Sequence, residues 1–336
     1  WPGVEISKLG IFYEKDTMMS QEKTLSYGIR WDQVEADPTR AADDPGSDHM
    51  LQVTANSLYT AHYSGTVTAG ERDWDSFSGF VRLQTTRGPM SKYYISLSHN
   101  ERTPDATELF HAKTTMAMGA KYRDRHIGNP NLDSEKHLTM ELGAEEMIAG
   151  NHVNASIYFT DIDDYITTYR VSDGTYDNSV NDARVYKNVD ATIWGYELSL
   201  SRNVTENVKT KLNLNYTNGN DDTQNRPLPQ IMPLSGNLVL DYETISSNYG
   251  MRLNFSDSQD RFDSRVLDTG KTGGYTTIDI FAGFELAPGM DLNFGISNIT
   301  DKRYSSHLSN ANVLDASATK VDEPGRSIWG SVVYDF

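Results

Sequence analysis

The sequence predicts an all-β chain, a transmembrane antiparallel β-barrel built from long hairpins. Three observations lead to this fold class. Apolar and polar residues alternate with period two through most of the chain, which is the period of strands rather than helices. Short turns and long polar connections follow one another in strict alternation. The chain finishes on another alternating run, "SIWGSVVYDF", whose last residue, Phe336, is aromatic.

Composition narrows the possible functions. The 336 residues include no cysteine, which excludes disulfides and thiolate metal sites in this chain. A formal net charge of −17 argues against a nucleic-acid partner and favours cations, although acidic loops also serve simply to keep a chain soluble. Apolar runs stay shorter than the roughly eighteen residues that a membrane-spanning helix needs, so none is predicted.

The strands are clearest in three hairpins. These hairpins cover residues 196–218, 236–258 and 276–298. In the first, Leu212, Leu214 and Tyr216 share one face, and the residues between them are polar. Turn residues such as Pro288 and Gly289 separate the two strands of a hairpin. The pattern therefore predicts one apolar and one polar face for each strand.

Connections alternate between two lengths. We expect six short turns, near residues 18–22, 86–91, 148–152, 203–207, 244–248 and 287–290. Long polar segments separate them, at residues 36–70, 102–135, 162–190, 217–232, 256–275 and 302–325. A short helix is expected inside the first long segment, within residues 39–58. Tight turns on one side and long loops on the other are typical of outer-membrane barrels.

The strand count predicts a partial barrel. Twelve strands flank the six turns and the terminal strand makes thirteen, whereas bacterial barrels close with an even number. We therefore expect further strands to precede residue 1. Lipid offers no hydrogen-bond partner, so every backbone group of such a wall must pair within a closed sheet. Aromatic residues near strand ends fit interfacial girdles, namely Tyr93, Tyr94, Tyr158, Tyr165, Trp194, Tyr196, Tyr304 and Trp329.

Four segments, in order over residues 92–336, resemble motifs of TonB-dependent outer-membrane receptors. The first combines "SLSHNERTPDATELF" with "IGNPNLDSEKHLTMELG", and the second is "VYKNVDATIWGYELSLS". The third and fourth are "LNFGISNITDKRYSSH" and "GRSIWGSVVYDF". The resemblance implies a 22-stranded barrel in the bacterial outer membrane, with an N-terminal plug domain in its lumen. Residues 1–336 are then the C-terminal portion, with strands ten to twenty-two, and the plug and first strands are missing.

The same resemblance implies partners. Uptake is expected to be energised by the TonB complex, which contacts the missing N-terminal part. Lipid and lipopolysaccharide surround such a barrel, and the barrel assembly machinery reads a terminal aromatic, here Phe336. A receptor rather than an enzyme is expected, because Ser, His and Asp occur in loops without the context of a catalytic set.

One connection, "ELFHAKTTMAMGAKYRDRHIG", contains candidate metal ligands. His111, Met116 and Met118 lie in it, together with His126. Thioether and imidazole groups suit copper, Cu(I) in particular, and Met116 and Met118 project to one side of an extended backbone. The opening "WPGVEISKLGIFYE" and the run "RHIGNPNL" resemble the copper-receptor branch of the family, so copper ion is the first expected substrate. In the alternative interpretation, these residues only pack the loop against its neighbours.

Two other functions remain open. A ferric siderophore, haem or cobalamin receptor would use basic and aromatic groups in its vestibule, and the candidates are Arg123, Arg125, Tyr169, Arg170 and Tyr176. A passive porin or a surface adhesin barrel is a further alternative. The four receptor motifs in order argue against that last class.

Overall fold

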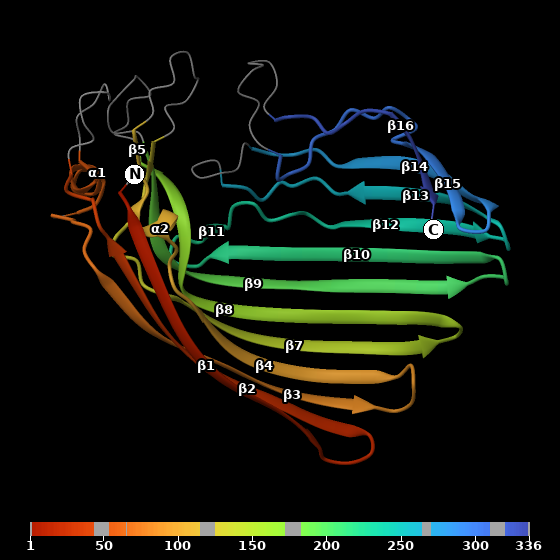
Figure 1. The fold of residues 1–336 in the computed structure, drawn as a ribbon, viewed down its shortest axis with the longest axis horizontal. Coiled ribbons are helices and arrows are strands. Elements are labelled where there is room, and N and C mark those ends of the chain that lie inside the picture. Colours follow the sequence, from red (N-terminus) through yellow and green to blue (C-terminus); the bar gives the residue numbers. More distant parts are fainter. Residues whose placement is uncertain are drawn as a thin grey trace.

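The computed structural model describes residues 2–43, 54–64, 66–114, 125–171, 183–263, 270–309 and 320–334. Within these residues, thirteen strands pair antiparallel in one unbroken order, with β1 at one edge and β16 at the other (Figure 1). The predicted all-β fold and its thirteen wall strands are confirmed. Figure 1 shows the sheet strongly curved, with the tight turns along one rim and the long connections along the opposite rim.

The wall strands are long. They are β1 (Val4–Met18), β2 (Lys23–Pro38), β3 (Arg72–Thr86), β4 (Lys92–Arg102), β7 (Glu135–Ile148), β8 (Asn151–Val171), β9 (Ala183–Asn203), β10 (Val208–Asp221), β12 (Ser235–Glu243), β13 (Ser247–Ser256), β14 (Tyr275–Ala287), β15 (Met290–Ser297) and β16 (Ser327–Tyr334). Smaller elements lie in the long connections: α1 (Ala55–His62), α2 (Ala106–Phe110), β5 (Ala112–Thr114), β6 (Arg125–Ile127) and β11 (Arg226–Pro227). Neither helix in the described residues is long and apolar enough to cross a membrane.

All six predicted short turns are confirmed. They join β1 to β2, β3 to β4, β7 to β8, β9 to β10, β12 to β13, and β14 to β15. Gly150 and Gly289 adopt positive φ angles of 81° and 76° in two of these turns, a conformation that glycine enters without strain. Turn chemistry in the sequence therefore located the tight rim correctly.

One predicted loop is wrong in extent. Residues 162–171 and 183–190, expected in a loop, continue β8 and β9 as paired strands. The pairing contains an irregularity between Ile162 and Tyr165, where Asp164 has a φ of 60° and its carbonyl accepts a hydrogen bond from the Asn188 amide. Polar residues such as Asp163 and Asp164 make this stretch resemble a loop in the sequence, while its backbone stays paired. The expected helix is also displaced, because α1 begins at Ala55 after its N-cap Thr54.

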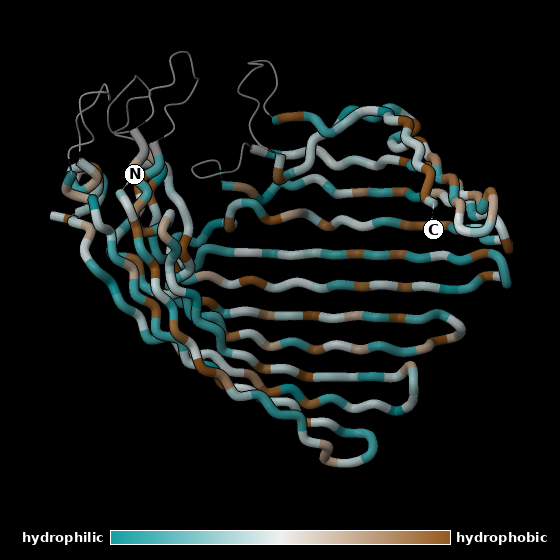
Figure 2. The backbone as a smooth tube through the Cα atoms, viewed as in Figure 1, coloured by the Kyte–Doolittle hydropathy of each residue, from teal (hydrophilic) through white to brown (hydrophobic). Residues whose placement is uncertain are grey.

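One face of the wall carries continuous apolar rows. Val81 pairs with Leu97, Leu97 with Met140, and Met140 with Phe159 across four consecutive strands. A second row has Leu83 beside Ile95 and Ile95 beside Leu142, and Figure 2 shows such apolar residues recurring along the strands. Directly paired residues share a face, so these side chains form a band. Exposed apolar side chains such as Leu97 (47%) and Met140 (45%) are what a lipid-facing surface needs.

The opposite face of the wall is polar, both on these strands and on β10 and β12. Asn213 donates a hydrogen bond to Asn237 at 2.9 Å, and the Tyr94 hydroxyl donates to Glu141 at 2.7 Å. The Arg82 guanidinium lies 3.6 Å from the centroid of the Tyr94 ring. This division into an apolar and a polar face matches the alternation in the sequence.

The buried apolar clusters of the described residues lie at the rim of the long connections. One cluster joins α1 to β6 and β9, through residues that include Tyr59, Ile127 and Val185. A second joins α2 to β2, β3 and β8, through residues that include Phe110, Trp74 and Ile166. The described parts of the connections that carry α1, α2 and β6 are therefore packed onto the strand ends and can hold side chains at defined positions.

Candidate functional site

The candidate site is built on α2 and the small hairpin of β5 and β6. The Asp105 carboxylate accepts hydrogen bonds from the backbone N–H groups of Thr107 and Glu108, at 2.7 and 2.8 Å. The Glu108 carboxylate in turn accepts from the Asp105 N–H at 2.9 Å, which completes a capping box. The cap fixes where α2 begins, and His111 is the C-cap residue where it ends.

The hairpin brings two histidines together. Ala112 of β5 lies opposite Ile127 of β6. His111 directly precedes β5, and His126 is the middle residue of β6. Their ring centroids are 5.4 Å apart and their planes are inclined by 53°. β6 also pairs in parallel with β9, where His126 lies opposite Arg184, so the hairpin is attached to the wall. Two imidazoles at this spacing can approach a common cation.

One tyrosine holds the backbone beside each histidine: Tyr59 lies in α1, and Tyr63 is the C-cap residue of α1. The Tyr59 hydroxyl donates to the carbonyl of Phe110, the residue before His111, at 2.8 Å. The Tyr63 hydroxyl donates to the carbonyl of Ile127, the residue after His126, at 3.0 Å. Burial raises the pKa of both phenols well above the usual value, so both remain neutral hydrogen-bond donors at physiological pH.

Gly128 makes the close approach of the two backbones possible. Its N–H donates to the His111 carbonyl at 2.6 Å. A Cβ atom at residue 128 would lie 2.6 Å from the backbone nitrogen of His111. It would also lie 2.6 Å from the carbonyl carbon and oxygen of Leu109. No side chain fits there without moving the backbone, so this position requires glycine.

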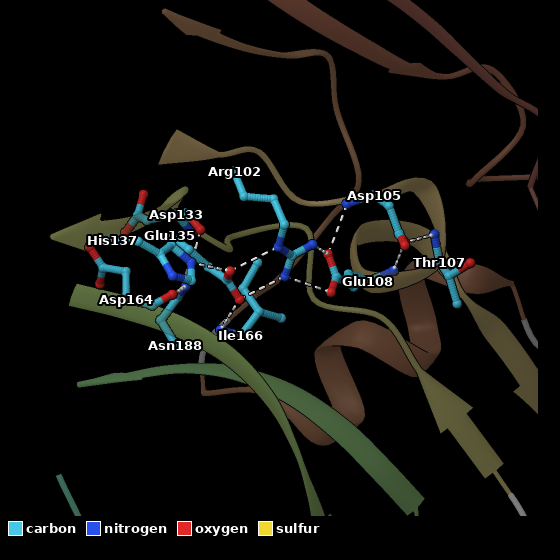
Figure 3. A network of polar contacts seen from close by, with 10 residues as sticks. All are labelled: Arg102, Asp105, Thr107, Glu108, Asp133, Glu135, His137, Asp164, Ile166 and Asn188. Atoms are coloured by element: carbon cyan, nitrogen blue, oxygen red, sulfur yellow. Dashed lines mark hydrogen bonds and ion pairs between the residues drawn. The ribbon is translucent and has the colours of Figure 1, made fainter. Parts of the chain in front are cut away.

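A polar network fixes α2 to the wall (Figure 3). The Arg102 guanidinium, at the end of β4, donates to both carboxylate oxygens of Glu108 at 2.9 and 3.0 Å. It also donates to both oxygens of Glu135, at the start of β7, at 2.8 and 2.7 Å. The Glu135 side chain is only 3% exposed. Its carboxylate also accepts a hydrogen bond from the Ile166 N–H and lies 2.8 Å from a ring nitrogen of His137. Bidentate pairs of this kind constrain orientation as well as distance.

Of the candidate metal ligands, only His111 is described. Met116 and Met118 lie outside the described residues, as does Phe336. His126, which was noted as a neighbour in the sequence but not among the first candidates, lies beside His111. The described residues contain no cluster of three or more His, Cys, Asp or Glu side chains that could hold a metal. Any described contribution to a metal site therefore rests on the histidine pair.

The siderophore candidates fare differently. Tyr169 is buried, its hydroxyl donates to Asp221, and the Arg226 guanidinium lies 4.2 Å from its ring centroid. A vestibule role for Tyr169 is therefore not supported. Arg123 and Tyr176 lie outside the described residues, and nothing is described of the side chains of Arg125 and Arg170.

Three residues that position the histidine pair were not predicted from the sequence: Tyr59, Tyr63 and Gly128. Tyr59 and the histidines are far apart in sequence, and only the fold brings them together. The one local signal in the sequence is Gly128 itself, a glycine two residues after His126.

The structure defines a class: an antiparallel wall of the kind found in membrane β-barrels, with the described parts of two long connections packed onto the strand ends at one rim. The sequence profile described as "TonB dependent receptor-like, beta-barrel" matches residues 15–299. The chain belongs to this family of TonB-dependent receptors, which are transport proteins rather than enzymes.

Individual relatives differ in their substrates. The copper transporter OprC has a solved structure with a TM-score of 0.82 and 26% identity, over 99% of this chain and 48% of that one. The ferric enterobactin receptor PirA of Pseudomonas aeruginosa is 26% identical over 222 residues, which are 62% of this chain and 29% of PirA. The ferric-catecholate import receptor Fiu of E. coli K12 shares the fold, with a TM-score of 0.67 at 15% identity, over 99% of this chain and 45% of Fiu. The chain thus spans about half the length of the solved relatives and less of PirA.

Proposed function

We propose that this protein is an outer-membrane receptor for TonB-energised, high-affinity uptake of copper ion. The observation that carries the proposal is the pairing of His111 and His126, with ring centroids 5.4 Å apart, on a hairpin at the rim of the long connections. The similarity to the copper transporter OprC supports the same substrate. Binding rather than bond chemistry is the task of such a site.

The ligand chemistry suits copper. Imidazole nitrogens bind copper well, and the thioethers of Met116 and Met118 lie in the sequence between the two histidines. A His and Met donor set favours Cu(I), whereas hard cations such as Ca²⁺ prefer oxygen ligands. In this proposal the histidines and methionines receive the ion at the rim and pass it inward.

The remaining parts of the transport machinery follow from family membership. We propose that residues 1–336 form the C-terminal portion of a 22-stranded barrel, and that an N-terminal plug and the first strands belong to the same receptor. The coverage of about half of each solved relative supports this division. The plug would couple to the TonB complex, the apolar band would face lipid and lipopolysaccharide, and Phe336 would serve the barrel assembly machinery.

Ferric siderophore uptake is the second candidate. It is favoured by the similarity to PirA, described as a ferric enterobactin receptor. A catecholate chelate is large and anionic, and would need basic and aromatic groups lining its vestibule. Tyr169 and Arg226 are instead paired with each other and with Asp221 in a buried cluster. The described residues thus offer less support for this substrate than for copper.

The test is metal retention by receptor purified from outer membranes. Samples exposed to copper or to a ferric catecholate are washed and analysed by mass spectrometry, for the native protein and for a variant with both His111→Ala and His126→Ala. We expect the native protein to retain copper and the double variant to lose it. His152→Ala is the matched control, because His152 lies beside Glu145 near the opposite rim. Retention of the iron chelate with no copper would refute the proposal in favour of the second candidate.

A further inference from the structure

The helix α1 reaches both sides of the histidine pair. It belongs to the connection between β2 and β3, whereas the histidines belong to the connection between β4 and β7. Tyr59 is fully buried, and Tyr63 also accepts a hydrogen bond from the backbone N–H of Tyr186 on β9 at 3.1 Å. One short segment therefore contacts β5, β6 and the wall strand behind them.

We propose that Tyr59 and Tyr63 are positioning residues for the metal site of His111 and His126, an inference that rests on the proposed copper-binding function. Each hydroxyl holds the carbonyl of a residue adjacent to one histidine, at 2.8 Å for Phe110 and 3.0 Å for Ile127. The two bonds attach the end of α2, just before β5, and the end of β6 to α1 and its C-cap residue. The spacing of the imidazoles is thereby set from outside the hairpin.

The geometry explains why both hydroxyls are needed. The β5–β6 hairpin has only three residues in each strand, and a two-stranded hairpin of that length is not stable alone. On the His111 side, the hairpin is continuous with α2, which the Arg102 network fixes. On the His126 side, the Tyr63 hydroxyl links Ile127 to the Tyr186 N–H of β9. Loss of either hydroxyl releases one side while the other stays in place.

A preorganised pair binds metal more tightly than a flexible one. Groups that orient metal ligands from outside the coordination sphere typically change affinity by about 10- to 100-fold when removed. Tyr59 and Tyr63 act on the backbone rather than on the imidazole nitrogens, so the lower end, about tenfold for each, is expected. The aromatic rings remain in phenylalanine variants, so packing in the cluster around Tyr59 is retained.

The experiment measures silver ion binding, as a redox-inert substitute for Cu(I), to receptor purified from outer membranes. The variants are Tyr59→Phe, Tyr63→Phe, and the double variant His111→Ala with His126→Ala. Tyr158→Phe is the matched control, because its hydroxyl bonds Thr217 at 2.8 Å in the wall and Tyr158 pairs with Gly195, about 36 Å along β9 from the Arg184 position beside His126. X-ray absorption on copper-loaded samples counts the imidazole ligands.

Three results are distinguishable. The proposal expects about tenfold weaker binding for Tyr59→Phe and for Tyr63→Phe with fewer ordered imidazole ligands, near-complete loss for the histidine variant, and no change for Tyr158→Phe. Native affinity and imidazole count in both tyrosine variants, with loss in the histidine variant, would overturn the positioning role and leave the copper site standing. Native affinity in the histidine variant would overturn both.

Discussion

Replacing Gly128 by alanine tests the proposed site at His111 and His126 by adding a single methyl group. The new Cβ atom would lie 2.6 Å from the backbone nitrogen of His111 and 2.6 Å from the backbone carbonyl carbon and oxygen of Leu109. Ordinary van der Waals contact begins at 3.4 Å. The two backbones must therefore separate by about 0.8 Å, because none of the three atoms belongs to a flexible side chain. Overpacking of this kind costs about 1–3 kcal/mol. This displacement would lengthen the hydrogen bond from the Gly128 N–H to the His111 carbonyl, and would thereby change the distance between the imidazoles of His111 and His126.

The assay for this variant is copper affinity by chelator competition, with folding followed by heat-modifiable gel mobility. Gly128→Ala should weaken copper binding by about tenfold or more, in the range expected for a disturbed ligand support. Gly70→Ala is the matched control, since no atom lies within 4 Å of a Cβ at that position. Native copper affinity in a correctly folded Gly128→Ala barrel would refute the reasoning that the close backbone approach positions His111.

Three further predictions concern the wall, the network and pH. Leu97→Arg places a charge in the apolar band and should make the free energy of folding into vesicles less favourable by about 2–4 kcal/mol, measured by denaturant titration. Ser96→Arg places the same charge on the polar face and should change this free energy little. Equal effects of the two substitutions would show that Leu97 does not face lipid. Arg102→Met leaves the Glu135 carboxylate, 3% exposed, without its guanidinium partner. It should lower the local stability of α2 by about 2 kcal/mol, a figure already reduced for the partial exposure of Arg102, and so speed amide hydrogen exchange there. Arg303→Met breaks an exposed ion pair with Asp322 and should leave exchange in α2 unchanged. Burial raises the pKa values of the Tyr59 and Tyr63 phenols, so their stabilising hydrogen bonds are present below about pH 10 and are lost only above it. A change in copper affinity confined to about pH 8–9 would contradict the role of these two phenols as neutral donors.

Much of the fold was predictable because its pattern is repetitive and local. Period-two alternation and turn residues such as Gly150 and Gly289 predicted the thirteen wall strands and their six tight turns. The upper parts of β8 and β9 were missed because they lie beyond the apolar band. Residues such as Asn188 there are polar and resemble a loop, yet their backbone remains paired.

The candidate site was predictable only in part. Its residue types, imidazole and thioether, were evident in the connection that holds His111. The proximity of His126 to His111 depends on a hairpin with three residues in each strand. The roles of Tyr59 and Tyr63 depend on contacts between two connections. Such contacts are set by packing between distant segments, for which a single sequence carries no periodic signal.

The central claim, that His111 and His126 bind copper together, is tested most directly by anomalous X-ray diffraction at the copper edge on crystals of the copper-loaded receptor. The account predicts an anomalous peak within bonding distance, about 2 Å, of a nitrogen of each imidazole. A copper peak elsewhere in the receptor, with none between His111 and His126, would contradict it.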